Sequence, residues 1–331
     1  MKSDQRRTMR PYEELTETGK IRRMHGIAHV ALEQYDLEVS RLRCIARDTN
    51  TTFRVDTTDR RTFALRVGAP RSDTAVDTAT ELAWLDMLAD DPAIEAVRPH
   101  RNRAGGLVTL AGHPGVPEER KCVLFDWLPG TPIGESADRD DYRRLGELAA
   151  RLHDHGERWR QPPGLSPLVW DRVFYYPTEP VVLYDDTFFE LLTPVRTSIV
   201  RAVEAKCDDE LSRLHRETPV SILHGDLHPW NVMRQGDRLL VFDFEDLMVG
   251  APVQDIAITL FYNRKHADYS GLCAAFEHGY TTLREWPVES QNQLEILMAA
   301  RTLMFINYVL RMGFDPDDYI PLAVERIKRV L

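Results

Sequence analysis

Residues 224–246 read HGDLHPWNVMRQGDRLLVFDFED, and this stretch decides the fold of the chain. Two runs of apolar or long side chains, at 232–234 and 239–242, flank a short polar turn at 235–238 that contains the glycine that tight turns favour. The pattern predicts a β-hairpin. If its strands pair about this turn, Asn231 lies almost opposite Phe242 and Asp243.

The open end of this hairpin has the composition of a cation site. Facing side chains on paired strands stand about 5 Å apart, so Asn231 and Asp243 are predicted to hold one oxygen-loving cation such as Mg²⁺. Asp226 lies just upstream, where it could orient a hydroxyl group beside that metal. One acid on a nucleophile, with an Asn and an Asp on magnesium, is the working set of phosphoryl transfer.

Two other interpretations fit the same residues. His224, Asp226 and His228 form an H-x-D-x-H pattern that resembles part of a zinc hydrolase cluster, although such clusters usually need further ligands at short spacing and none follows. His228 could equally be a loop residue hydrogen-bonded to backbone, in a turn with a purely structural role.

Composition limits the class of protein and its partners. The chain has 331 residues, enough for two domains or one bilobal enzyme, with 43% hydrophobic and 28% charged residues, as in a globular protein. Its formal charge of −10 argues against non-specific binding to nucleic acid or to an anionic membrane. Cationic partners are favoured if the acidic residues gather near a cleft.

Cysteine usage and the chain's ends indicate a compartment. The four cysteines are scattered without a C-x-x-C pair, which suggests a reducing environment and no disulfide framework. The polar, basic beginning lacks the apolar core of a signal peptide. No run approaches the roughly 20 apolar residues that span a bilayer. We therefore expect a cytoplasmic protein without a membrane partner, and the oligomeric state stays open.

The remaining pattern predicts an α+β protein with a small antiparallel β-rich N-lobe and a larger α-helical C-lobe. Residues 1–25 are polar and are expected to form a frayed or loosely docked helical arm. The N-lobe is placed at 26–128 and the C-lobe at 129–331, with Pro129 and Gly130 in the link. The predicted strands are 41–46, 52–55, 62–67, 107–110 and 121–127, and the predicted helices are 75–89, 138–155 closed by Gly156, 188–215, 253–262 and 291–312.

A phosphoryl-transfer site also needs a cation on the nucleotide phosphates. In residues 63–67 the alternation puts Arg66 on the face opposite Phe63, Leu65 and Val67, so Arg66 is a candidate phosphate ligand. Glu81 in the following helix could pair with Arg66. It could instead close a capping box with Thr78, and the sequence leaves both readings open.

Three further residues are candidates for nucleotide contacts. Asn50 lies in the turn at 47–52, which could cover phosphates without glycines, and Phe125 and Trp127 lie at the end of the last predicted N-lobe strand. Neither G-x-x-x-x-G-K-[ST] nor G-x-G-x-x-G occurs, which counts against a P-loop enzyme or a Rossmann dehydrogenase.

The motifs together resemble the aminoglycoside phosphotransferase and choline kinase superfamily, with its homoserine kinase-like and bacterial stress-response kinase branches. The family's H-x-D-x-x-x-x-N loop is matched by His224, Asp226 and Asn231, and its following metal aspartate by Asp243. The segments LGELAARLH at 145–153 and GAPVQD at 250–255 are similar as well.

This resemblance implies a bilobal protein-kinase-like fold and transfer of the γ-phosphoryl group of ATP. It implies that Asp226 is the catalytic base or acceptor-orienting group, that Asn231 and Asp243 bind Mg²⁺, and that His224 and Asp255 brace the loop. Many members have lysine where this chain has Arg66, whose planar fork would grip phosphates differently. We read Arg66 as a variant, since Asp226, Asn231 and Asp243 are intact.

The segment between Asp243 and Asp255 is short and has no A-P-E ending, which favours a small-molecule hydroxyl acceptor over a protein. The insert at 157–222 is rich in aromatic residues that could form a cage for a cation, although plain packing is the simpler reading. With a charge of −10, a cationic alcohol of the aminoglycoside or amino-alcohol type is favoured. The alternatives are a stress-response Ser/Thr protein kinase and a nucleotide-binding module without turnover.

Overall fold

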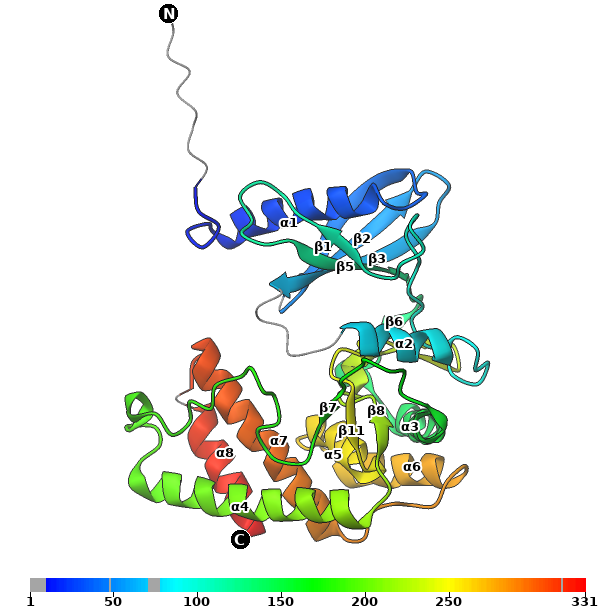
Figure 1. Ribbon diagram of the computed structural model, residues 1–331. Helices are drawn as coiled ribbons and strands as arrows, with labels where there is room; N and C mark the ends of the chain where they lie inside the picture. The colour runs from blue at the N-terminus through cyan, green and yellow to red at the C-terminus, as the bar shows by residue number, and fades with distance from the viewer. Residues whose placement is uncertain (1–9, 48, 71–77, 317) are drawn as a thin grey trace, which may run out of the picture. The chain divides into compact units, whose positions relative to one another are not determined.

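A computed structural model describes residues 10–47, 49–70, 78–316 and 318–331. The chain forms two compact units (Figure 1). The first comprises Met1–Thr74 and Val97–Leu128, and the second comprises Ala75–Ala96 and Pro129–Leu331. The predicted α+β class is confirmed.

The first unit is built on a five-stranded antiparallel sheet with the order β1-β2-β3-β5-β4. All five predicted strands are present, each shifted or extended by a few residues. Their bounds are β1 (Val39–Arg47), β2 (Thr51–Thr57), β3 (Thr62–Pro70), β4 (Thr109–Ala111) and β5 (Arg120–Asp126). In β3 every second residue is buried, which places Arg66 on the face opposite Leu65, as its alternation predicts.

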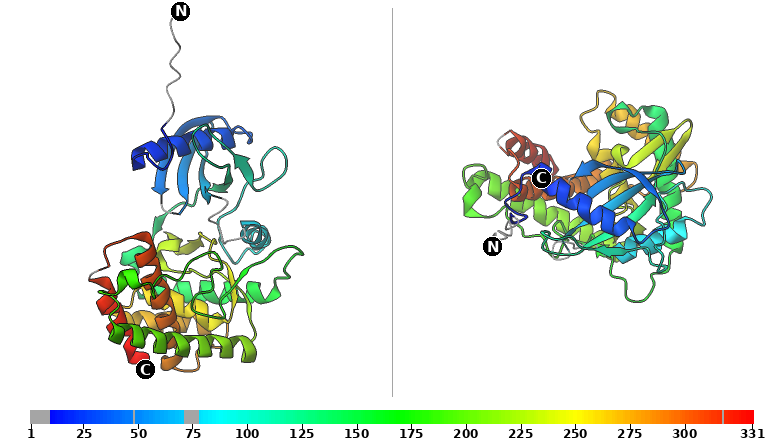
Figure 2. Two further views of the ribbon diagram at one scale, coloured as in Figure 1. Left: turned by 60° about the vertical axis from the view of Figure 1, so that its left-hand side comes forward. Right: turned by 90° about the horizontal axis from the view of Figure 1, so that it is seen from above.

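Helix α1 (Glu17–Leu32) packs along one face of this sheet, and both views of Figure 2 show this packing. Thr16 caps its first turn by accepting a hydrogen bond from the Gly19 amide. Met24 and Ile27 are buried in one cluster with Phe53. The segment predicted as a loose arm up to residue 25 therefore includes the first half of a core helix from Glu17 onward, because its apolar face covers the sheet.

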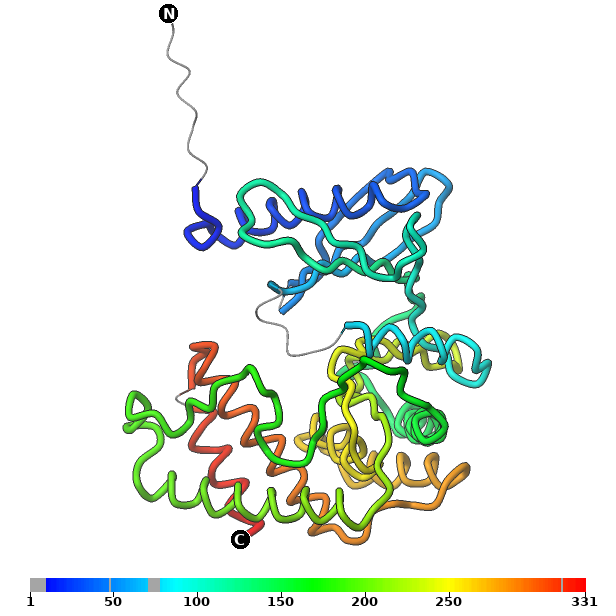
Figure 3. Tube along the Cα trace, viewed as in Figure 1, coloured from blue at the N-terminus to red at the C-terminus, as the bar shows by residue number. Residues whose placement is uncertain are grey.

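The second unit consists mainly of helices, with two small three-stranded sheets ordered β10-β9-β6 and β7-β11-β8. The chain path can be followed in Figure 3. Its helices are α2 (Thr78–Leu88), α3 (Arg139–Arg158), α4 (Pro194–Glu217), α5 (Pro252–Tyr262), α6 (Tyr269–Thr281), α7 (Gln291–Met312) and α8 (Tyr319–Ile327). Its strands are β6 (Thr131–Pro132), β7 (Leu168–Val169), β8 (Ser221–Leu223), β9 (Val232–Gln235), β10 (Arg238–Val241) and β11 (Met248–Gly250).

Helix α2 belongs to the second unit, whereas its place in the sequence suggested the N-lobe. Trp84 explains the difference, because its indole is fully buried and donates a 2.9 Å hydrogen bond to Nδ1 of His155 on α3. The same indole meets the ring of Phe244 edge-on, with centroids 5.5 Å apart. These contacts attach α2 to the segment that follows the β9–β10 hairpin.

Helix α3 continues through Gly156, which was expected to end it, and stops at Arg158. The glycine serves close packing: a Cβ there would lie 2.2 Å from the carbonyl oxygen of Ile222 on β8. Helix α4 begins later than the predicted 188, since Thr193 caps it and Pro194 is its first residue.

Helix α7 has the length and composition of a membrane span, although its sequence was expected to fall short of one. Within the structure, 72% of its most apolar window is buried. Such burial is typical of the core helix of a globular domain, so the helix is weak evidence for a membrane.

The contact between α3 and α6 depends on two glycines. A Cβ at Gly146 would lie 2.1 Å from the carbonyl oxygen of Phe276, and one at Gly279 would lie 1.8 Å from that of Arg143. Both distances are too short for real atoms, so the two backbones touch only because neither position carries a side chain.

Gly279→Ala therefore tests this packing. Helix propensity alone would raise stability by up to ~1 kcal/mol, whereas the clash with backbone should lower the free energy of unfolding by about 1–3 kcal/mol. Urea unfolding shows whether the free energy of unfolding rises or falls. Ala274→Gly, at an exposed position of the same helix, calibrates propensity, and a more stable Gly279→Ala protein would contradict the close contact.

Candidate functional site

The β9–β10 hairpin has the predicted register. Val232 pairs with Val241 and Gln235 with Arg238, around a turn in which Gly236 has a φ of 61°. Beyond the strands, the Phe242 amide donates a 3.1 Å hydrogen bond to the Asn231 carbonyl. Asn231 therefore faces the residue directly before Asp243, as the sequence indicates.

The hairpin is fixed to the start of α3 by two ion pairs. Arg234 on β9 contacts the fully buried carboxylate of Asp141 at 2.6 Å, and Arg144 contacts Asp237 in the turn at 2.9 Å. Asp141 also closes a capping box with Asp138 at the helix N-terminus. The first turn of α3 thus fixes the position of the hairpin strands.

The loop before the hairpin is held by the buried carboxylate of Asp255, at the start of α5. Its two oxygens accept hydrogen bonds from the backbone amides of His224, at 3.2 Å, and of Gly225, at 3.0 Å. His153 on α3 lies 3.4 Å from the same carboxylate through Nε2. The three segments that resemble the phosphotransferase superfamily therefore meet at one side chain.

Gly225 lets the loop turn at this point. Its φ is 80°, a conformation that favours glycine, and a Cβ would lie 1.9 Å from the carbonyl oxygen of Asp246. The loop thus packs against the segment after β10 without room for a side chain.

His224 has a structural environment. Its Nδ1 accepts a hydrogen bond from the Asp226 amide and its Nε2 donates to the Phe242 carbonyl, both at 3.2 Å. Burial lowers the pKa of the imidazole. Among the described residues no group of three or more His, Cys, Asp or Glu side chains could hold a metal ion, so the zinc cluster interpretation is wrong for the described part of the chain.

The Asp226 carboxylate is the centre of a buried polar cluster. Its Oδ1 accepts hydrogen bonds from the Tyr262 hydroxyl at 2.9 Å and from Arg301 Nη2 at 2.6 Å. Its Oδ2 lies 3.2 Å from His228 Nε2 and accepts a 3.3 Å hydrogen bond from Asn231 Nδ2. Asn231 also donates to the Asp226 carbonyl, at 3.0 Å.

Opposing effects act on the pKa of Asp226. Burial raises it, while the positive charge of Arg301 and the hydrogen bonds from His228 and Tyr262 lower it. The lowering effects are larger, so the pKa of Asp226 lies well below its usual range. The carboxylate is therefore ionised at neutral pH and suited to accepting a hydrogen bond.

Asn231 and Asp243 have the features of a cation site. Asn231 donates both of its side-chain hydrogen bonds to Asp226 through Nδ2. Its Oδ1 accepts no hydrogen bond from any residue that the structure describes. Asp243 is exposed and has a φ of 65°, which is uncommon for a residue other than glycine. Mg²⁺ typically binds one or two such side chains together with phosphate oxygens, so this pair fits it.

The candidate nucleotide residues of the first unit fall into separate contacts. The guanidinium of Arg66 lies over the ring of Phe125, 5.1 Å from its centroid, and the Trp127 ring instead receives Arg54 at 4.8 Å. Asn50 Oδ1 accepts a 3.0 Å hydrogen bond from the Ala69 amide, which links the β1–β2 turn to β3. The structure thus brings Arg66 and Phe125 together on one face of the sheet.

Glu81 is buried on α2. The described part of α2 begins at Thr78. Both interpretations of Glu81, the capping box with Thr78 and the pairing with Arg66, stay predictions.

Sequence reasoning missed four residues around Asp226. Tyr262 and Arg301 contact its carboxylate, and Tyr176 donates a 2.6 Å hydrogen bond to Oδ1 of Asp246. Two signals were available: Arg301 is a charge within the apolar run of α7, and Asp246 is the last acid of the decisive stretch. Neither reveals which side chain it meets.

The aromatic residues of the insert do not gather into a single cage. Trp159, Trp170 and Tyr175 are buried in the core, and Tyr184 lies under Arg201 with its hydroxyl on Glu204. Tyr176 reaches Asp246, and the ring of Tyr175 stacks on it at 4.5 Å. Packing explains most of these rings, as the simpler interpretation predicts.

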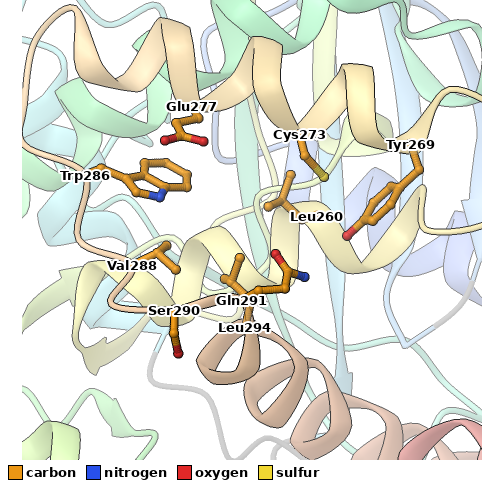
Figure 4. Close-up of a pocket in the computed structure, with 9 residues that line it drawn as sticks. All are labelled: Leu260, Tyr269, Cys273, Glu277, Trp286, Val288, Ser290, Gln291 and Leu294. Atoms are coloured by element: carbon orange, nitrogen blue, oxygen red, sulfur yellow. The ribbon is translucent and has the colours of Figure 1, made fainter. Parts of the chain in front are cut away.

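A pocket of about 170 Å³ lies elsewhere in the second unit, between α5, α6 and α7 (Figure 4). It is lined partly by Cys273 and Glu277 of α6 and by Trp286. None of the residues that contact Asp226 lines it, so it is distinct from the polar cluster at Asp226.

Comparisons with known proteins find a family model, relatives and solved structures that resemble this chain. A model described as the phosphotransferase enzyme family matches residues 45–288. An uncharacterised protein of Synechocystis is 26% identical over 285 residues, which cover 82% of this chain and 74% of that protein. A homoserine kinase of Beijerinckia indica is 28% identical over 218 residues, which cover 63% of this chain and 61% of the kinase.

Two solved structures share the fold. An amicoumacin kinase in complex with AMP-PNP, Ca²⁺ and Ami gives a TM-score of 0.73 at 16% identity, covering 95% of this chain and 96% of that one. A microcompartment-associated aminopropanol kinase gives a TM-score of 0.72 at 22% identity, covering 92% and 94%. These likenesses show the kinase-like fold.

Asp255→Asn tests the bracing of the loop. The substitution replaces one acceptor oxygen by an amide donor facing the His224 and Gly225 amides, and hydrogen bonds to a charged group contribute about 1.5–3 kcal/mol each. We expect the free energy of unfolding to fall by about 2–3 kcal/mol in urea titrations. Asp237→Asn, whose side chain is 95% exposed, should change it by less than ~1 kcal/mol, and equal effects would contradict the bracing role.

Proposed function

The chain belongs to the phosphotransferase enzyme family, and we propose that it moves the γ-phosphoryl group of Mg-ATP to a hydroxyl group of a small, amine-bearing molecule. As a family member it is a phosphotransferase with an alcohol group as acceptor. The donor, the metal ion and the class of acceptor are the proposed parts, and each is supported by a different contact.

One observation carries the proposal. Asn231 joins the two halves of the site, because its Nδ2 group binds Asp226 while its Oδ1 is left for a cation beside Asp243. A single side chain therefore sets the position of the acceptor-binding acid relative to the metal. When bound, Mg²⁺ would neutralise charge on the phosphates and on the transferring group.

Asp226 orients the acceptor hydroxyl in this proposal. Its ionised carboxylate, held by Arg301 and Tyr262, can accept the hydroxyl proton as a hydrogen bond and direct the oxygen at the phosphorus. A low pKa makes it a weak base, which is compatible with a loose transition state in which bonding to the nucleophile is limited. Orientation is therefore its main contribution.

The phosphate-binding role of Arg66 follows from its face of the sheet and its always-charged guanidinium. Phe125 beneath it offers an apolar surface for the base of the nucleotide, and Asn50 and Trp127 extend this region. Glu81, buried on α2, is the proposed partner that would fix Arg66.

The acceptor's amine is supported by the charges around Asp226. Two acids, Asp226 and Asp246, share one nearby arginine, Arg301, so the cluster has one negative charge in excess. Burial, and then the negative charge of Asp226, raise the pKa of Asp246. An ammonium group beside Asp246, near the stacked rings of Tyr175 and Tyr176, would compensate this charge.

The similar proteins are compatible with such an acceptor. One relative is named as a homoserine kinase and one structural neighbour as an aminopropanol kinase. Both names denote small molecules that bear an amine and a hydroxyl group, which is the chemistry proposed for this chain.

Asp226→Asn should remove turnover and leave nucleotide binding intact. The amide cannot accept the hydroxyl proton in the same way, so we expect kcat to fall by about 10²–10⁴-fold. Phosphate transfer from Mg-ATP to a broad panel of hydroxyl compounds measures this. Phosphate appearing on the protein itself, with no acceptor used, would favour the protein kinase alternative.

Asp243→Ala should instead impair the binding of the nucleotide. Loss of a metal carboxylate weakens Mg²⁺-dependent nucleotide binding, and we expect the Kd for Mg-ATP to rise at least ~10-fold. Calorimetric titration with and without Mg²⁺ measures the effect. The role assignment is wrong if Asp226→Asn impairs nucleotide binding while Asp243→Ala loses only turnover.

Asp246→Asn tests the amine. The wild-type protein should phosphorylate 1-amino-2-propanol with a higher kcat/KM than 1,2-propanediol, which has a hydroxyl in place of the amine. We expect the substitution to cut this preference by at least ~10-fold, mainly through KM, because a charge-assisted contact of about 1.5–3 kcal/mol is lost. Glu277→Gln removes an exposed acid in the separate pocket and should leave the preference unchanged.

A further inference from the structure

We propose that Arg301 also binds an anionic group of the acceptor, so that the acceptor is a small zwitterion of the hydroxy amino acid class. The inference rests on the proposed function, because it concerns the same hydroxyl-binding site at Asp226. It goes further by naming a second charged group of the acceptor and the residue that would select it.

Arg301 has more hydrogen-bond donors than the protein uses. Its Nη2 group donates to Asp226 Oδ1 at 2.6 Å and to the Tyr262 hydroxyl at 3.1 Å. Its Nε is buried without a partner among the described residues. Its Nη1 group likewise makes no hydrogen bond to any residue that the structure describes.

Burial makes these spare donors significant. Arg301 is only 7% exposed, and a buried N–H without an acceptor costs about 1–3 kcal/mol, more when the group is charged. Most buried polar groups in proteins have a partner. A hydrogen-bond partner from outside the protein, either a ligand or water, is therefore expected at the buried Nε.

Support of Asp226 alone does not account for this arrangement. An arginine that serves only a carboxylate usually binds it with two parallel N–H groups. Here a single nitrogen, Nη2, serves both Asp226 and Tyr262. Nε and Nη1 lie on different edges of the planar guanidinium, so each can donate a separate hydrogen bond to an oxygen of a bound anion.

The local charges decide which anion fits. A simple hydroxy acid would bring a third negative charge next to Asp226 and Asp246, which already share the charge of Arg301. A simple amino alcohol would satisfy Asp246 and leave the donors of Arg301 unmet. A hydroxy amino acid satisfies both, with its ammonium group at Asp246 and Tyr176 and its carboxylate at Arg301.

The site also limits the size of the acceptor. Arg301 contacts the carboxylate of Asp226, which would also bind the acceptor's hydroxyl group. The carboxylate and the hydroxyl group of the acceptor must therefore lie a few bonds apart. Serine, threonine and homoserine meet this condition. Their decarboxylated counterparts are ethanolamine, 1-amino-2-propanol and 3-aminopropanol, which gives three matched pairs that differ only by the carboxylate.

The experiment compares kcat/KM within each pair, using Mg-ATP and the full-length protein. A site built for a polar group strongly rejects an analogue that lacks it. For at least one pair we expect the wild-type protein to favour the amino acid by ~30-fold or more. 3-Hydroxybutyrate, which is threonine without its amine, should be a poorer acceptor than threonine.

Arg301→Lys is the decisive variant, because lysine keeps a positive charge beside Asp226 and loses the planar set of donors. Its kcat should fall for all acceptors, and the preference within a pair should shrink to ~3-fold or less. Arg311→Lys is a matched control on the same helix: Arg311 also has an unpartnered Nε but pairs with Glu179 and makes no contact with Asp226. It should leave the preference unchanged.

Failure of the inference is distinguishable from failure of the proposed function. Phosphorylation of amino alcohols and amino acids with equal kcat/KM, or a preference that Arg301→Lys leaves intact, overturns the inference and leaves the phosphotransferase activity standing. No transfer above the Asp226→Asn background overturns the proposed function. In that event the inference is tested by calorimetric binding of serine and ethanolamine. Equal affinity of the wild-type protein for the two compounds excludes a carboxylate site at Arg301.

Discussion

The buried carboxylate of Asp255 is the constraint on which the loop before the β9–β10 hairpin depends. It binds two consecutive backbone amides, those of His224 and Gly225, and it is itself reached by His153 from α3. Two amides on one carboxylate fix the loop's direction, and Gly225 then allows the sharp turn that presents Asp226. Because α3 and α5 both supply groups to this contact, the position of the loop follows from helix packing in the second unit.

The electrostatics of Asp226 follow from the same placement. A carboxyl in this buried position would tend to hold its proton, and the charge of Arg301 reverses that tendency. Arg301 comes from α7, the most apolar long helix, where an unpaired charge would be costly. The ion pair therefore serves both residues: Asp226 stays ionised, and Arg301 is tolerated within a core helix. The negative charge of Asp246 is the one that we propose an amine of the acceptor compensates.

The sequence predicts the features that arise from neighbouring residues. The hairpin register follows from one turn around Gly236, and the facing of Asn231 and Phe242, directly before Asp243, follows from the register. Contacts between distant segments could not be predicted from the sequence. The place of α2 depends on Trp84 meeting His155 and Phe244, and the cluster at Asp226 depends on Tyr262 and Arg301. Apolar periodicity identifies such helices, but it does not say which side chains of different helices meet.

Phe244 explains how Asp243, the proposed metal ligand, is presented. Its ring is fully buried, 4.5 Å from the His224 ring and 5.5 Å from that of Trp84. With Phe244 fixed inward, Asp243 adopts a φ of 65° and its side chain is exposed. Such a conformation costs on the order of 1–3 kcal/mol and persists only where packing determines it. Helix α2 contributes to that packing through Trp84, so the helix that carries Glu81 also supports the residue next to Asp243.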